Sequence, residues 1–113
     1  MTTLRDIALL RLVAQRIAGP GFASVGDAVG WLTAVQGQDY RGAVTSIALR
    51  TAARTRQGVE AAMNAGEIVR SWPMRGTLHV VPAQDLVWML ELTAPRMLAG
   101  EARRRAGLGL EAA

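Results

Sequence analysis

The sequence contains no cysteine, no lysine and only one histidine among its 113 residues. The absence of cysteine excludes disulfides and thiolate metal sites, and a single histidine without a cluster of carboxylates gives no basis for a catalytic metal. We therefore expect no metal and no other cofactor.

Long apolar runs are also missing. The first apolar stretch is interrupted by Arg11 and Arg16, so it is too short to span a bilayer and does not have the pattern of a signal peptide. We expect a soluble cytoplasmic protein with no membrane partner.

All thirteen basic residues are arginines, set against nine carboxylates, which gives a formal net charge of +4. Guanidinium groups suit phosphates and base edges better than ammonium groups do. The charge therefore favours an acidic partner such as nucleic acid. A GC-rich coding bias that writes basic surface positions as arginine would produce the same composition, and one sequence does not separate the two explanations.

Aromatic residues make up only 4% of a chain that is half hydrophobic, and the chain has the length of one domain. The core should therefore consist of aliphatic side chains packed between helices. Trp31, Trp72 and Trp88 are expected to be its bulkiest members.

Apolar residues recur at helical spacing through the first 65 residues. The predicted helices are residues 4–18, 25–35, 43–50 and 56–65. Ser24 and Thr55 are in place to cap the second and fourth of these helices, and Gly66 is placed to end the fourth.

The period then changes to that of strands. The predicted strands are residues 68–72 and 77–81. Residues 73–76 between them hold the Pro and Gly of a hairpin loop, so the pair reads as a wing. Pro82 and Pro95 each suit the first turn of a helix, which predicts two further helices, the second of which carries Arg103-Arg104-Arg105.

Helices followed at once by a hairpin give the order of a winged helix-turn-helix domain, a mainly α fold with a small β-hairpin. We expect this domain to cover residues 1–82 and a helical connection toward a following domain to cover residues 83–113. The helix before the wing carries Arg56 but also Glu60, so it is poorly charged for lying against DNA phosphates.

Polar residues are concentrated in Gln36-Gly37-Gln38-Asp39-Tyr40, directly after an apolar helical run. Two interpretations are open for this segment. It is either a polar helix terminus or a small constellation that positions a reacting molecule.

Two segments together resemble a known family: residues 34–40, Ala-Val-Gln-Gly-Gln-Asp-Tyr, and residues 68–79, Ile-Val-Arg-Ser-Trp-Pro-Met-Arg-Gly-Thr-Leu-His. They are similar to the winged-helix DNA-binding proteins whose characterised members are AlkZ-like DNA glycosylases, enzymes that unhook alkylated bases and interstrand crosslinks. The resemblance covers nearly the whole chain from about Leu10. It implies a several-domain enzyme of tandem winged helices plus a β-barrel, of which this chain is the first winged helix.

In that family a Gln-x-Gln motif supplies the catalytic pair, and this sequence matches it at Gln36 and Gln38. The middle position, usually a larger apolar residue, is Gly37 here, which is expected to loosen the loop. The resemblance implies a monofunctional glycosylase that hydrolyses the N-glycosidic bond of alkylated or crosslinked purines in double-stranded DNA. The chain by itself is expected to be inactive.

The chemistry of such a pair is limited but sufficient. A glutamine amide cannot act as a general base near neutral pH, but its carbonyl can hold a water and its NH2 can anchor a phosphate or sugar oxygen. Two glutamines at i and i+2 point the same way only where the backbone is extended or turning. An N-alkylated purine is already cationic, so it leaves without strong acid catalysis.

Four residues are candidates for contacts with DNA: Tyr40, Arg41, Arg70 and Arg75. Tyr40 could stack on a base, and the arginines could grip phosphates. A partly buried tyrosine and solvated surface arginines are the alternatives.

Three neighbouring residues have simpler interpretations. Asp39 is expected to cap the next helix, Trp72 to lie in the core, and His79 to be a half-buried structural residue within a strand. Arg103 to Arg105 fit equally a phosphate contact and a solvated helix end.

Two other classes of function compete with the glycosylase. A non-catalytic winged-helix DNA binder or transcriptional regulator would show sequence preference, although it would need a more basic helix before the wing. A structural module for dimerisation or domain packing would show only weak, uniform affinity for DNA.

Overall fold

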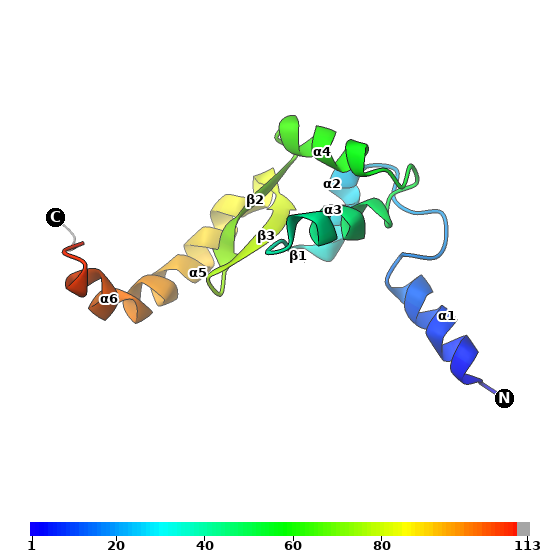
Figure 1. The fold of residues 1–113 in the computed structure, drawn as a ribbon, viewed down its shortest axis with the longest axis horizontal. Helices are drawn as coiled ribbons and strands as arrows, with labels where there is room; N and C mark the ends of the chain where they lie inside the picture. Colours follow the sequence, from blue (N-terminus) through cyan, green and yellow to red (C-terminus); the bar gives the residue numbers. More distant parts are fainter. Residues whose placement is uncertain (111–113) are drawn as a thin grey trace.

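The structure is a computed structural model that describes residues 1–110. Its elements, in chain order, are α1 (Leu4–Ala14), α2 (Val25–Leu32), β1 (Val35–Gln36), α3 (Tyr40–Ala48), α4 (Arg56–Asn64), β2 (Ile68–Met74), β3 (Thr77–Pro82), the 3-10 turn η1 (Ala83–Asp85), α5 (Leu86–Gly100) and α6 (Ala102–Gly107). The body of the molecule is formed by α2 to β3, with α1 at one end and α5 and α6 at the other (Figure 1). The last three residues of the connection expected over 83–113 lie outside the described residues.

Side-chain caps set the starts of the helices, as the sequence predicted for two of them. The Ser24 hydroxyl accepts the Asp27 N–H at 3.0 Å, and the Thr55 hydroxyl accepts the Gly58 N–H at 3.2 Å. Gly66, which follows α4, has a φ of +75°, a conformation that glycine adopts without steric cost. These helix boundaries therefore follow from local chemistry.

The end of α2 differs from the prediction. The helix stops at Leu32 because Thr33 takes a positive φ of +66°, and Val35–Gln36 then form β1. The polar segment therefore does not end α2, as one interpretation had it. Gln36 is the last residue of β1, and the segment leads from there into the start of α3 at Tyr40.

The sheet has three antiparallel strands in the order β1-β3-β2, so a strand that the sequence pattern did not predict extends the wing. β1 pairs with β3 through Val35 opposite Val80 and Gln36 opposite His79. The central strand β3 is thus hydrogen-bonded on both sides, and β1 and β2 are the edges.

The hairpin between β2 and β3 is tighter than expected. Its turn consists of Arg75 and Gly76, both with positive φ (+52° and +66°), as two-residue hairpin turns require. Pro73 lies within β2, where an edge strand tolerates a residue without an N–H. The register of the hairpin shifts between Ser71 and Met74.

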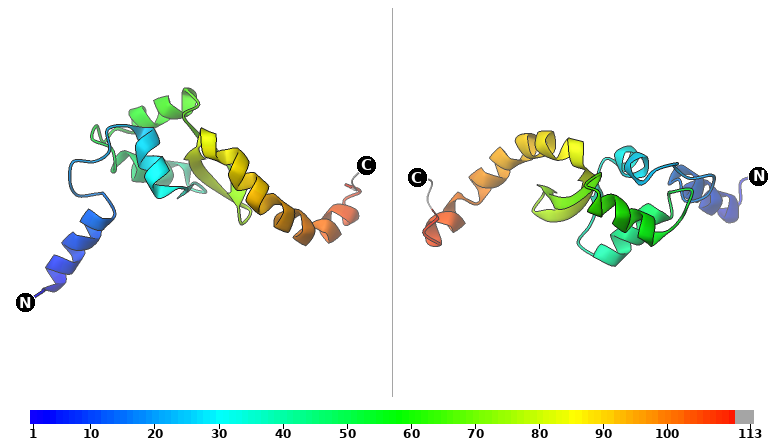
Figure 2. Two further views of the ribbon diagram at one scale, coloured as in Figure 1. Left: turned by 180° about the vertical axis from the view of Figure 1, so that it is seen from behind. Right: turned by 90° about the horizontal axis from the view of Figure 1, so that it is seen from above.

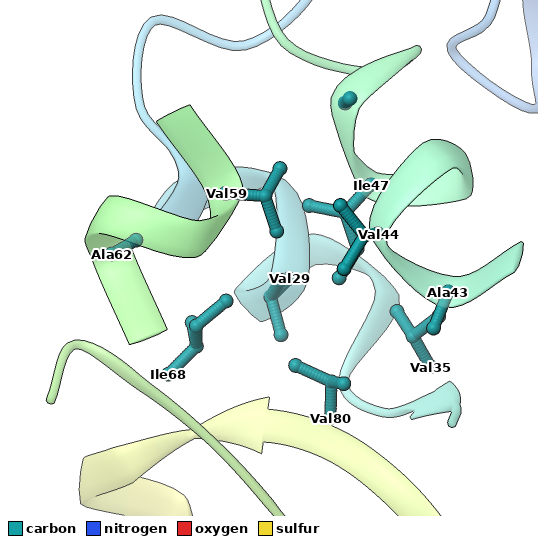
Figure 3. Packing of buried hydrophobic residues seen from close by; sticks show 10 residues of the cluster. Val29, Val35, Ala43, Val44, Ile47, Val59, Ala62, Ile68 and Val80 are labelled. Carbon is teal, nitrogen blue, oxygen red and sulfur yellow. The ribbon is translucent and has the colours of Figure 1, made fainter. Parts of the chain in front are cut away.

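The core lies between one face of the sheet and helices α2, α3 and α4 (Figure 3). Its buried members are Val29, Val35, Ala43, Val44, Ile47, Ala48, Val59, Ala62, Ile68 and Val80. All of them are aliphatic, as the composition predicted. Successive strand residues face opposite sides of a sheet, so Val35 and Val80 mark the core face.

The opposite face of the sheet is covered by α5, which packs along β2 (Figure 2). Val81 is fully buried without belonging to the core cluster, and Met89 of α5 is 3% exposed. The Thr93 hydroxyl donates a hydrogen bond to the Pro73 carbonyl, which fastens the middle of α5 to the hairpin.

The expected helix break at Pro95 is absent. α5 continues through Pro95, and Arg103 to Arg105 belong to the separate helix α6. A proline inside a helix removes one backbone hydrogen bond, and the rest of α5 persists around it.

The helix α1 contributes no buried residue and extends away from the body (Figure 1). Arginines fasten the segment that follows it. Arg54 donates to the carbonyls of Ile17 and Gly19, and Arg50 donates to the Gln15 side chain at 3.2 Å. Burial lowers the pKa of the Arg50 guanidinium from its usual value.

The tryptophans are not the core residues that the composition suggested. Trp72 is 57% exposed, and Trp31 and Trp88 are 44% and 46% exposed. Trp72 lies where the hairpin extends beyond the helices that cover the core, next to the register shift. The core closes on smaller aliphatic side chains instead.

The described chain is mainly helical with a small three-stranded antiparallel sheet, an architecture compatible with a winged helix. Among residues 1–110, no helix combines the length and the apolar character needed to cross a membrane.

Replacing Ile47 by alanine should lower the free energy of unfolding by about 2–5 kcal/mol, because it removes a fully buried side chain and leaves a cavity. Leu49, the C-cap residue of α3, is 39% exposed and is the matched control; its change to alanine should cost less than about 1 kcal/mol. Urea denaturation of the two variants measures the difference. Equal losses would show that the packing around Ile47 is not the core.

Candidate active site

Gln36 lies on the face of the sheet opposite the core. Its neighbour Val35 is buried against Val80, so strand alternation turns Gln36 and its partner His79 to the other side. On β2, Ser71 pairs with His79, so Gln36, His79 and Ser71 lie side by side across the three strands on this face. Gln36 is exposed, and its side chain forms no hydrogen bond within residues 1–110.

His79, opposite Gln36, is buried at 3% exposure, more deeply than the half-buried residue we expected. Its Nδ1 lies 3.0 Å from the Thr77 carbonyl oxygen, so a proton on that nitrogen donates to the carbonyl. The structural interpretation of His79 therefore fits its surroundings.

Gly37 is held by hydrogen bonds on both sides of its peptide. Its N–H donates to the Leu78 carbonyl at 2.7 Å, and its carbonyl accepts from Arg70 Nε at 2.8 Å. A methyl group at this position would lie 3.4 Å from the nearest atom, Val80 Cγ2, which is ordinary contact. The glycine therefore lies in a fixed backbone that also has room for a larger residue, and the loosened loop that we expected is not what these contacts describe.

Gln38 takes part in strand pairing through its side chain. The Leu78 N–H donates to Gln38 Oε1 at 3.2 Å, while the Gly37 carbonyl, which would continue the ladder, is taken by Arg70. The amide oxygen of Gln38 thus stands in for a backbone acceptor at the point where β1 leaves the sheet. This contact leaves the Gln38 NH2 group and one lone pair of its oxygen for other partners.

Arg70 connects β2 to the polar segment. Besides its bond to Gly37, its Nη2 donates to the Gln38 carbonyl at 3.3 Å, and its guanidinium lies 5.6 Å from the centre of the Tyr40 ring. This is a cation–π distance. Arg70 therefore orients the two-glutamine segment, a role that the sequence did not indicate.

Asp39 occupies the N-cap position of α3, as expected, although the helix starts at Tyr40 and not at residue 43; its carboxylate makes no capping hydrogen bond. The carboxylate lies over the first turn instead, where a methyl group on Gly42 would be only 2.6 Å from Asp39 Oδ2. Gly42 accordingly leaves room for the Asp39 side chain.

The structure joins three of the predicted site residues, Gln38, Tyr40 and Arg70, through the contacts above. Gln36 makes no such contact within residues 1–110, because it faces away from the core whereas Arg70 pairs with Val80 and lies on the core face of the sheet. Arg41 is exposed on the first turn of α3, and Arg75 stands at the hairpin turn, three residues before Leu78. Neither has a hydrogen bond or ion pair within the described part of the chain.

One basic residue near the hairpin was missed by sequence reasoning. Arg96 of α5 lines a surface cavity together with Arg75. Their separation of 21 positions carries no periodic pattern, so only the packing of α5 on the hairpin reveals the pair.

The arrangement offers amide and guanidinium groups for chemistry. Two amides at i and i+2 lie on exposed backbone beside an arginine and a tyrosine, so the cluster can hold a water, a phosphate or a sugar oxygen. No group of three or more His, Cys, Asp or Glu side chains among residues 1–110 has the arrangement of a metal site.

Comparison with known proteins gives consistent matches. A family model described as DNA glycosylase AlkZ-like matches residues 29–113. A protein of Streptomyces sahachiroi named interstrand DNA cross-link repair glycosylase is 37% identical over 90 residues, which cover 80% of this chain and 24% of that protein.

Among solved structures, Streptomyces sahachiroi DNA glycosylase AlkZ matches with a TM-score of 0.57 and 32% sequence identity. The match covers 72% of this chain and 22% of the solved chain. This chain therefore spans about a quarter of the length of the relatives it matches.

Changing Gln38 to alanine should lower the free energy of unfolding by about 0.5–1.5 kcal/mol, since it removes the acceptor of the Leu78 N–H. Gln36→Ala is the matched control and should stay within about 0.5 kcal/mol of wild type, because its side chain has no such bond. Denaturant unfolding compares the two. The same small change in both variants would mean that the Gln38 bond contributes nothing to strand pairing.

Gly37→Ala should leave the free energy of unfolding unchanged or raise it by up to about 1 kcal/mol, because the added methyl meets only ordinary contacts and the unfolded chain loses freedom. Gly21→Ala is the contrasting control. Its φ of +75° and the Thr51 backbone 2.7 Å from an added methyl should make it clearly destabilising. Thermal unfolding of both proteins tests the pair, and a destabilised Gly37→Ala would show that only glycine fits there.

Proposed function

Because this chain belongs to the AlkZ-like DNA glycosylase family, we propose that it is the winged-helix part of an enzyme that removes damaged purines from DNA. The reaction is hydrolysis of the N-glycosidic bond of alkylated or crosslinked purines in double-stranded DNA. The relatives are more than three times as long, so the remaining surfaces that enclose the DNA come from outside residues 1–113.

The observation that carries this proposal is the placement of the two glutamines. Gln36 and Gln38 are both exposed while Gly37 between them is buried, so the two amides share the outer side of the segment. A polar surface loop would not need four tertiary hydrogen bonds, at Gly37 and Gln38, to hold it in one conformation. Fixed orientation is what positioning of a reactant requires.

The two amides have different surroundings, which supports different roles. Gln38 Oε1 is already bonded to the Leu78 N–H, so its NH2 group is the part available to anchor a sugar or phosphate oxygen. The Gln36 side chain is unbonded within residues 1–110, so its carbonyl oxygen can hold the attacking water. A neutral amide facing the sugar also stabilises the positive charge that develops as the bond breaks.

The basic and aromatic residues around the pair supply contacts to DNA in this proposal. Arg70 holds the segment and has guanidinium donors left for a phosphate, and Tyr40 is 38% exposed with its ring beside Arg70. Arg41 and Arg75 are exposed and bind backbone phosphates on either side. The stacking of Tyr40 on a base belongs to the same proposal.

The domain arrangement is likewise proposed. Residues 1–82 form one winged helix of a tandem series, and residues 83–113 begin the connection to the next domain. Support comes from the position of α5 and α6, which leave the body at the end opposite α1 (Figure 1).

In the full-length protein, Gln36→Ala and Gln38→Ala should each lower base release from a duplex with N7-alkylguanine by ~100- to 1,000-fold, the loss typical of one stabilising group at a reaction centre. Binding of the same duplex should change little. Single-turnover release with excess enzyme measures the effect on chemistry.

The matched control is Gln57→Ala, which removes an exposed glutamine amide from α4 and should leave release at the wild-type rate. Wild-type release in both active-site variants, with binding intact, would assign the chain to a non-catalytic DNA-binding role.

A further inference from the structure

The surface cavity between the hairpin turn and α5 combines two arginines with apolar walls. It has a volume of about 440 Å³ and is lined by Arg75, Leu92, Thr93, Arg96 and Met97. Pockets that bind small ligands have volumes of roughly 300–1,000 Å³, so one phosphate with its sugar fits within it.

The two guanidinium groups in this cavity are not neutralised. Neither Arg75 nor Arg96 forms an ion pair or a hydrogen bond within residues 1–110, and no acidic side chain lines the cavity. Two cations that share a cavity repel each other, and an anion between them removes that cost. Guanidinium forks match the oxygens of a phosphate with paired hydrogen bonds.

The wall of the cavity is held in place by direct contacts. The Thr93 hydroxyl donates to the Pro73 carbonyl, and Met97 lies 4.0 Å from where a Cβ on Gly76 would stand. These contacts fix the hairpin turn against the middle of α5 (Figure 2). Arg75 and Arg96 therefore line one cavity although they come from different elements.

Arg75 has an unusual backbone for its residue type. It lies in the left-handed region with φ +52°, where asparagine or glycine is favoured in a two-residue hairpin turn. An arginine at this position costs folding energy relative to asparagine or glycine, as it does at Arg16 and Arg54, which also have positive φ.

We propose that this cavity binds one phosphate group between Arg75 and Arg96, and that its source is a phosphodiester of the DNA backbone. This inference rests on the proposed function for its source and deepens it by assigning the second arginine. Leu92 and Met97 then contact the apolar edge of the adjoining sugar.

The position fits a contact on the same DNA as the glutamine pair. Arg75 precedes Leu78, the partner of Gln38, by three residues, which is roughly 10 Å along an extended strand. α5 and Gln36 lie on the same face of the sheet, away from the core. A phosphate in the cavity would therefore lie a few nucleotides from a base held at the glutamines.

The test measures affinity of the full-length protein for unmodified duplex over a salt series, with Arg75→Asn, Arg96→Gln and the double variant. Asparagine suits the positive φ at position 75, so this variant should be at least as stable as wild type while it loses the charge. Each single variant should bind about tenfold more weakly, and the salt slope should fall by about 0.9, as expected for one phosphate.

The double variant separates one shared phosphate from two. If both arginines hold the same phosphate, its affinity should be close to that of the single variants and the slope should fall no further. Multiplied losses with twice the change in slope would overturn the shared site. The control is Arg5→Gln on α1, at the far end of the molecule, which removes the same charge and should leave affinity within about twofold.

A second arm identifies the source of the phosphate. Calorimetry with inorganic phosphate reports binding in the cavity, which should vanish in Arg96→Gln. Phosphate binding together with wild-type DNA affinity in the variants would assign the cavity to a free anion and overturn the backbone source. Wild-type behaviour in both measurements would overturn the site itself.

Base release distinguishes this inference from the proposed function. At saturating enzyme, Gln36→Ala should lower the rate of base release while its affinity for the duplex stays near the wild-type value, whereas Arg75→Asn and Arg96→Gln are compared by affinity and salt slope alone. If Gln36→Ala released the base at the wild-type rate, the proposed glycosylase function would be wrong. The affinities of the arginine variants would still test the phosphate site independently.

Discussion

The pairing of β1 with β3 is the constraint on which the candidate site depends. Burial of Val35 against Val80 decides the face that Gln36 takes, because strand residues alternate. The bond from the Gly37 N–H to Leu78 then ends the ladder, and α3 starts at Tyr40. Two aliphatic contacts in the core thus orient an amide on the opposite side of the sheet.

Structure and chemistry overlap at the residues that follow. Gln38 completes strand pairing with the same side chain that we propose for catalysis, and Arg70 holds the segment with the same guanidinium that we propose for DNA. Such overlap fixes the orientation of Gln38 and Arg70, because the side chains proposed to contact the DNA are also held by hydrogen bonds within the chain. It also means that stability and activity are linked at Gln38 but separable at Gln36.

The two faces of the small sheet have different tasks. One face closes the aliphatic core with α2, α3 and α4, and the other carries Gln36 and receives α5 (Figures 2 and 3). Because α5 is fastened to the hairpin at Thr93, the basic residues of hairpin and helix act as one surface. In the full-length enzyme that we propose, this surface would be one wall of the DNA site, since the relatives are more than three times as long as this chain.

Elements whose causes are local could be predicted from the sequence. Residues a few positions apart account for the helix caps at Ser24 and Thr55, the glycine at position 66 and the alternation of the hairpin strands. The two motif segments indicated the family. Tertiary structure alone decided the rest. A two-residue strand has too little pattern to predict, so β1 formed only because β3 offered it a partner. Three further features also depend on segments that are distant in the chain: the exposure of Trp72, the hydrogen bond from Arg70 to Gly37, and the shared cavity of Arg75 and Arg96. The spacing of residues along the sequence does not predict how such segments pack.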